Sequence, residues 1–119
     1  MAKNRENMTG DFLRNVAASA PAAPVSGDPV LVGQIPGVAL KDELADGTTP
    51  IQTNGNWRMS VKAENNAGNS PVAVGDILYY EAGQTPPLNK DNVAGIRWGY
   101  ALEVISTGAT ATIIVKVGY

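Results

Sequence analysis

The apolar residues of this chain fall in short runs that turn residues separate. Gly and Pro account for 13 and 8 of the 119 residues, and the runs are rich in Val, Ile, Tyr and Thr, which favour strands. No segment has a long helical period. Many short strands joined by glycine turns are typical of a small closed or layered β structure. The sequence therefore predicts an all-β protein, a small β-barrel or β-sandwich with an extended N-terminal arm.

Two segments show strict alternation of apolar and polar residues. Along 57–64, Trp, Met, Val and Ala alternate with Arg, Ser, Lys and Glu, and 109–117 has the same period. Each segment should be a strand with one face on the core. Further strands are expected at 29–32, 38–40, 77–80 and 98–105. Loops are expected at 41–50, where one helical turn at 41–45 is compatible with the sequence, at 65–71 and at 82–95.

The dipeptide Asn54-Gly55 lies between two such apolar runs. Asn-Gly favours the two-residue turn of a hairpin, because both central residues of that turn need a positive φ. The sequence therefore predicts a hairpin that joins 51–53 to 57–63.

A short sequence motif occurs twice in similar form. GDPVLVGQIPGVAL begins at Gly27-Asp28, and GDILYY begins at Gly75-Asp76 and is followed by GYALE at 99–103. Gly supplies an unusual φ and the Asp side chain can accept a backbone hydrogen bond. A duplicated ligand site, or a catalytic pair formed by the two carboxylates, would be the alternative. We interpret the repeat as two equivalent corners of the fold.

The N-terminal segment differs in composition from the rest of the chain. Residues 1–11 are polar and without periodicity, and Pro-rich sequence follows them. The sequence predicts a flexible arm at 1–15 and a β-barrel-like domain at 16–119.

The composition argues against catalysis, metal binding, nucleic-acid binding and membrane association. The chain has no Cys and no His, so a Ser-His-Asp triad and a His- or Cys-based zinc site are excluded. We expect no enzyme activity, no cofactor and no metal. The net charge is −2 with no basic stripe, which disfavours nucleic acid as a partner. The absence of an apolar run of about 20 residues disfavours a membrane.

One other binding function stays open. A small β-barrel can bind single-stranded nucleic acid or a small ligand through exposed aromatic rings and a basic groove. This hypothesis would use the five aromatic residues Trp57, Tyr79, Tyr80, Trp98 and Tyr100, for which we favour core or subunit-contact roles because the sequence has no basic groove. Its cations would be Arg58, Lys62 and Arg97.

The order and spacing of three segments resemble a known family. These are SGDPVLVGQIPGVAL, VAVGDILYYE and GYALEVISTGATATIIVKV, within a similarity that runs from about Val16 to Val117. The chain resembles the tailed-bacteriophage head decoration proteins, or capsid cement proteins, formerly a domain of unknown function.

The resemblance implies a structural protein without catalytic residues. It would bind the outer surface of an assembled capsid, commonly as a homotrimer where subunits of the major capsid protein meet, and would stabilise the shell. It would be located in the virion after synthesis in the cytoplasm of the host bacterium.

The arm and the long loop are the segments that we expect to be exposed and flexible. Capsid or subunit contacts are therefore predicted there, at Lys3, Asn4, Arg5, Phe12, Leu13, Arg14, Pro86, Pro87 and Leu88.

Overall fold

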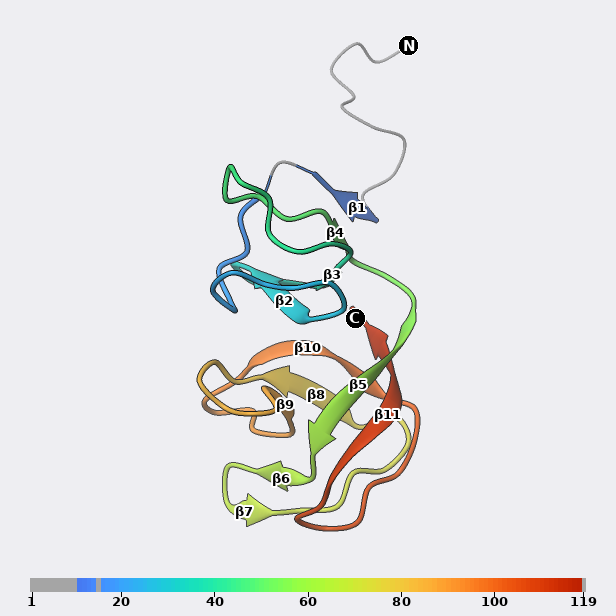
Figure 1. The fold of residues 1–119 in the computed structure, drawn as a ribbon. Helices are drawn as coiled ribbons and strands as arrows, with labels where there is room; N and C mark the ends of the chain where they lie inside the picture. The colour runs from blue at the N-terminus through green and yellow to red at the C-terminus, as the bar shows by residue number, and fades with distance from the viewer. Residues whose placement is uncertain (1–10, 15, 119) are drawn as a thin grey trace.

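The computed structural model describes residues 11–14 and 16–118, and it is all-β with no helix among them. The strands form a closed barrel, a small sheet next to it and a short hairpin (Figure 1). The predicted fold class is therefore confirmed, and of the two architectures the chain adopts the barrel. Of the predicted arm, only 11–14 lies within the described residues.

The barrel has the strand order β10-β11-β5-β9-β8. Its strands are β5 (Asn56–Lys62), β8 (Ile77–Tyr80), β9 (Leu88–Asn89), β10 (Ile96–Ala101) and β11 (Thr110–Val117). The small sheet has the order β1-β4-β3-β2. Its strands are β1 (Phe12–Leu13), β2 (Pro29–Val32), β3 (Ile35–Ala39) and β4 (Ile51–Gln52), and the hairpin consists of β6 (Glu64–Asn65) and β7 (Gly68–Asn69).

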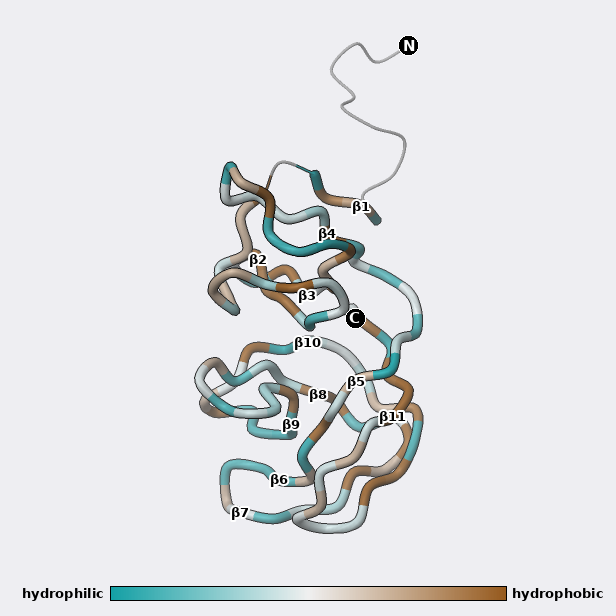
Figure 2. The backbone as a smooth tube through the Cα atoms, in the orientation of Figure 1, coloured by the Kyte–Doolittle hydropathy of each residue, from teal (hydrophilic) through white to brown (hydrophobic). Residues whose placement is uncertain are grey.

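The alternating segments supply the barrel core as predicted. Met59 and Val61 of β5 and Ile113 and Val115 of β11 are buried, and the two strands pair antiparallel along their length. Figure 2 shows hydrophobic residues along β11 and hydrophilic residues around the β6–β7 hairpin. Burial of the apolar face of each strand is the main term that stabilises this packing.

The small sheet packs against the barrel near β10 (Figure 1). Leu31 of β2 and Val38 of β3 belong to the same buried cluster as the barrel residue Trp98. The indole Nε1 of Trp98 donates a hydrogen bond to the carbonyl of Gly37 at 3.3 Å. The face of β2 and β3 that carries Leu31 and Val38 is thus buried between the small sheet and the barrel.

The first glycine-aspartate corner opens β2. Gly27 has a φ of 89°, and its N–H donates to the carbonyl of Ala39 at 2.8 Å while the Ala39 N–H donates to the Asp28 carbonyl at 3.0 Å. The Asp28 carboxylate accepts the N–H of Val25 at 3.0 Å.

The second corner has the same bonds and opens β8. Gly75 has a φ of 90°, its N–H donates to the carbonyl of Ala101 at 2.7 Å, and the Ala101 N–H donates to the Asp76 carbonyl at 2.9 Å. The Asp76 carboxylate accepts the N–H of Ala73 at 2.8 Å. The repeated motif therefore builds the same corner twice.

The equivalence extends into the sheets. Ala39 of β3 pairs with Ile51 of β4, and Ala101 of β10 pairs with Val115 of β11. The strand series β2-β3-β4 thus corresponds to β8-β10-β11. In line with this, Val30, Ala39 and Ile51 form a separate buried cluster in the small sheet.

The predicted hairpin at Asn54-Gly55 is wrong. β4 pairs with β1 and β3, whereas β5 pairs with β11 and β9. Gly55 has a positive φ of 98°, but the positive-φ residue other than glycine among the described residues is Ala23, so Asn54 lacks the conformation that the turn needs. The segment instead carries the chain from the small sheet into the barrel.

Four smaller expectations also need correction. The loop at 65–71 contains part of the β6–β7 hairpin, and 41–50 has no helical turn. The strand expected at 98–105 is β10, which begins at Ile96 and ends at Ala101. The strand expected at 38–40 is β3, which already begins at Ile35 and ends at Ala39, because Ile35 pairs with Val32 across a tight turn at 33–34.

Candidate functional site

The two repeated carboxylates have structural roles. Asp28 and Asp76 each accept the backbone N–H three residues earlier in their own corner. Among residues 11–14 and 16–118, no group of three or more His, Cys, Asp or Glu side chains lies together as a metal site would require.

The predicted contacts in the arm divide into two groups. Lys3, Asn4 and Arg5 lie outside the described residues. Phe12 and Leu13 form β1, which pairs with β4 at the edge of the small sheet. The Phe12 side chain is 44% exposed, whereas Leu13 packs against the buried cluster of the small sheet.

Arg14 is exposed. Its contact role, like that of the other arm residues, stays a prediction.

The predicted contacts in the long loop are less exposed than expected. Pro86 and Pro87 are half-buried, and the Pro87 carbonyl accepts the N–H of Glu81 at 2.8 Å. The expectation that Leu88 is exposed is wrong, because its side chain is fully buried. Leu88 begins β9, which bridges β8 to Val61 of β5 and so closes the barrel.

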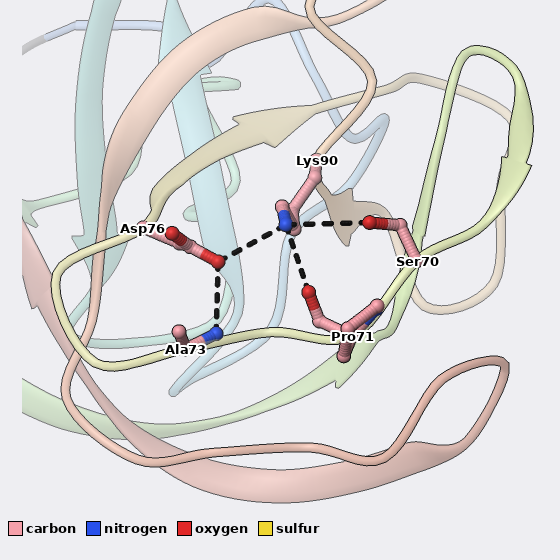
Figure 3. A network of polar contacts seen from close by, with 5 residues as sticks. All are labelled: Ser70, Pro71, Ala73, Asp76 and Lys90. Atoms are coloured by element: carbon pink, nitrogen blue, oxygen red, sulfur yellow. Dashed lines mark hydrogen bonds and ion pairs between the residues drawn. The ribbon is translucent and has the colours of Figure 1, made fainter.

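A polar network fixes the chain after β9 to the second corner (Figure 3). The Lys90 ammonium lies 3.0 Å from the Asp76 carboxylate and donates to the carbonyl of Pro71 at 2.8 Å. It also lies 3.5 Å from the hydroxyl of Ser70. Partial burial alone would raise the pKa of Asp76, but the Ala73 N–H and the Lys90 ammonium together lower it.

A surface hollow of about 440 Å³ lies beside this network. Its wall is mostly polar at Asn65, Asn66, Asp76, Lys90 and Asn92, with Gly75, and it is apolar or aromatic at Ile77 and Tyr79.

The outward side of β8, β10 and β11 carries aromatic and basic residues. Cross-strand pairing joins Tyr79 to Arg97 and Ile77 to Tyr100, and Tyr100 to Lys116. Directly paired residues point to the same side of a sheet, and β8 alternates so that Leu78 and Tyr80 point inward. We call Ile77, Tyr79, Arg97, Tyr100 and Lys116 the aromatic–basic face.

Tyr100 lies at the centre of the aromatic–basic face and contacts two cations. Arg97 donates a hydrogen bond to the Tyr100 hydroxyl, and its guanidinium lies 5.3 Å from the centroid of the Tyr100 ring. The Lys116 ammonium lies 5.7 Å from the same centroid. Both distances fall within the range of cation–π attraction. Both cations therefore favour the observed orientation of Tyr100.

Sequence reasoning found part of this face but not its geometry. Tyr79 and Tyr100 were candidates for a nucleic-acid site or for core or subunit-contact roles, Arg97 was a candidate only for a nucleic-acid site, and Lys116 was not singled out. The β10 register shifts between Arg97 and Gly99, and such a bulge changes which side of the sheet each residue faces. The alternation of β11 was the signal that could have identified Lys116.

Two of the cations of the nucleic-acid hypothesis lie close to carboxylates. Arg58 lies 4.0 Å from the Glu103 carboxylate, and Lys62 lies 3.5 Å from that of Glu64. Nearby carboxylates reduce the attraction of these two side chains for phosphate.

Comparison with known proteins identifies the family. A family model described as phage cement protein matches residues 9–117, almost the whole chain. The chain therefore belongs to the phage cement protein family. Comparisons with curated proteins and with solved structures found no match.

Family membership gives the chain a coarse role and place. The family is one of structural phage proteins, which suggests a capsid-binding role and a location on the capsid of the virion. No helix within 11–14 and 16–118 is long and apolar enough to cross a membrane.

Proposed function

We propose that this protein binds the outer surface of an assembled bacteriophage capsid, contacts the major capsid protein and stabilises the shell. The observation that carries the proposal is the family match over residues 9–117. The proposal includes that it acts as a binding protein without catalysis, and that it is made in the host bacterial cytoplasm.

The fold is suited to this role. The barrel and the small sheet share one buried cluster, so the domain is formed before it binds. A preformed surface loses little conformational entropy on binding. Many copies on one shell would each add a small contact free energy, and these contributions would sum over the lattice.

The edge of the small sheet supports a role for the arm. β1 is the last strand of that sheet, and an edge strand offers unpaired backbone groups that a partner strand can bind. We propose that Lys3, Asn4, Arg5, Phe12, Leu13 and Arg14 contact the capsid or a neighbouring copy. Pro86 and Pro87 are proposed contacts in the loop.

A homotrimer is the proposed assembly on the capsid. A head-to-tail contact between identical chains closes into a ring when the rotation between copies permits it, and a three-membered ring fits a threefold position of a lattice.

Co-sedimentation with undecorated heads tests the function. The purified protein is mixed with expanded heads of the phage that encodes it, over a range of protein and salt concentrations. We expect saturable binding at a fixed number of copies per major capsid subunit, and a higher temperature of head disruption after binding. Heads that neither retain the protein nor gain stability would overturn the proposal.

A further inference from the structure

The internal repeat places equivalent faces of two strand pairs, β2-β3 and β8-β10, in two different environments. Pro29 pairs with Val38, and Ile77 pairs with Tyr100 in the corresponding strands. By this register, Val38 corresponds to Tyr100. Two residues further along β2 and β8, Leu31 corresponds to Tyr79 by the same register.

In the small sheet this surface is a contact surface. Leu31 is 3% exposed and Val38 is fully buried, because both pack into the barrel cluster around Trp98. The fold thus uses the outward side of the β2-β3 pair to hold another part of the protein.

In the barrel the corresponding surface faces outward and carries different types of side chain. Tyr79 and Tyr100 are half-buried, and Lys116 is exposed. Aliphatic residues are replaced by tyrosines beside Arg97, the residue types that dominate binding energy at protein interfaces. Aliphatic side chains suit a contact inside the protein. Tyrosine suits a surface that is exposed to solvent before it binds, because its large ring carries a polar hydroxyl.

We propose that the aromatic–basic face is the surface that docks onto an acidic, partly apolar patch of a shell protein. This inference rests on the proposed function and assigns it to particular residues. The contact would be centred on Tyr100, with Arg97 and Lys116 facing carboxylates of the partner.

The charge of the face indicates an acidic partner. The whole chain has a net charge of −2, yet Arg97 and Lys116 both lie beside Tyr100. Positive charge concentrated on one face of a negative protein orients it toward a negative surface.

The chemistry of Tyr100 indicates the same partner. Its hydroxyl oxygen accepts the hydrogen bond from Arg97, so the hydroxyl proton is available to an external acceptor, and a carboxylate is the strongest one that proteins offer. The contacts with the two cations favour one orientation of the ring, which reduces the side-chain entropy lost on binding.

The neighbouring hollow extends the surface. Ile77 and Tyr79 belong to both the aromatic–basic face and the wall of the 440 Å³ hollow. A loop of the partner could therefore enter the hollow beside the Asp76–Lys90 pair while its acidic residues contact the face. A flat contact combined with a concave one restricts the orientation of docking.

Charge neutralisation tests the inference. The variant Arg97→Gln/Lys116→Gln removes both cations, and Lys41→Gln/Lys62→Gln makes the same change in net charge elsewhere. In co-sedimentation with expanded heads we expect the first variant to bind about tenfold or more weakly than wild type and with a smaller salt dependence. The control variant should bind as wild type does.

Additional variants and probes make each outcome decisive. Lys116→Glu changes one exposed side chain and serves if the double variant unfolds, as thermal melting would reveal. Equal binding of wild type and these variants would overturn the inference while leaving the proposed function intact. If wild type itself does not bind heads, both fail. Tight, salt-sensitive binding of a single-stranded oligonucleotide that is lost in the double variant would assign the face to nucleic acid instead.

Discussion

At the residue scale, Asp76 and Asp28 occupy the same position in two equivalent corners but differ in their surroundings. Asp76 has the Lys90 ammonium at 3.0 Å, whereas the ion pairs found among the described residues do not include Asp28. Both carboxylates accept a backbone N–H. The pair therefore provides a matched comparison of the same corner with and without an ion pair.

We expect Asp76→Asn to lower the free energy of unfolding by about 1 kcal/mol more than Asp28→Asn does. An asparagine oxygen can still accept the backbone N–H, so the difference isolates the contact with Lys90. Chemical denaturation of both variants at neutral pH measures it. Equal losses would show that the ion pair contributes nothing.

The same comparison has a pH dependence with a defined sign. The pKa of Asp76 is lowered in the folded state, so the unfolded chain binds the proton more tightly. The contribution is present above the unfolded pKa of about 3.9 and is lost as the pH falls through the folded pKa. The difference between wild type and Asp76→Asn should therefore shrink below about pH 4.

Gly99 and Gly37 are a second matched pair. A Cβ on Gly99 would clash with the backbone carbonyl of Lys116, whereas a Cβ on Gly37 would chiefly clash with a side-chain methyl of Ile51. Gly99→Ala should cost about 3 kcal/mol and Gly37→Ala about 2 kcal/mol, because the stiff β-branched side chain of Ile51 can shift a little, whereas the Lys116 carbonyl is held in a paired strand. Thermal unfolding measures both. A larger cost at Gly37 than at Gly99 would contradict this steric explanation.

At the scale of elements, β1 links the N-terminal arm to the fold. Leu13 packs on the cluster of Val30, Ala39 and Ile51, while Phe12 is largely exposed at the sheet edge. Deletion of 1–10 should therefore leave the melting temperature nearly unchanged and weaken binding to heads. Deletion of 1–15 removes β1 and should also lower stability. Unchanged head binding after both deletions would refute the contact role of the arm.

The strands that the sequence predicts best are those with one solvent-exposed face and one buried face. β5 and β11 alternate strictly, so their inward residues follow from the pattern alone. The corners at Gly27 and Gly75 were also predictable, since φ and the Asp side chain are local properties.

The elements that sequence reasoning missed depend on distant partners. The pairing of β5 with β11 rather than with β4 joins segments far apart in the chain, and a local Asn-Gly signal contains no information about it. Likewise, Leu88 is buried because β9 closes the barrel, although its flanking prolines suggested an exposed loop. The aromatic–basic face depends on the bulge in β10, which the alternation does not reveal.

At the scale of the whole molecule, one repeated strand motif serves two purposes. In the small sheet its outward side joins two parts of the chain, and in the barrel the same side is left for a partner. The repeat is thus architectural, and its open copy supplies the surface that we assign to docking. This arrangement fits the capsid-binding role that we propose for this member of the phage cement protein family.

The most direct test of capsid binding is a cryo-electron microscopy map of expanded heads incubated with saturating protein. We predict density on the outer surface for a small barrel at defined lattice positions, in groups of three copies, with β8, β10 and β11 directed at the major capsid protein. Heads whose outer surface carries no added density at saturating concentration would contradict the central claim.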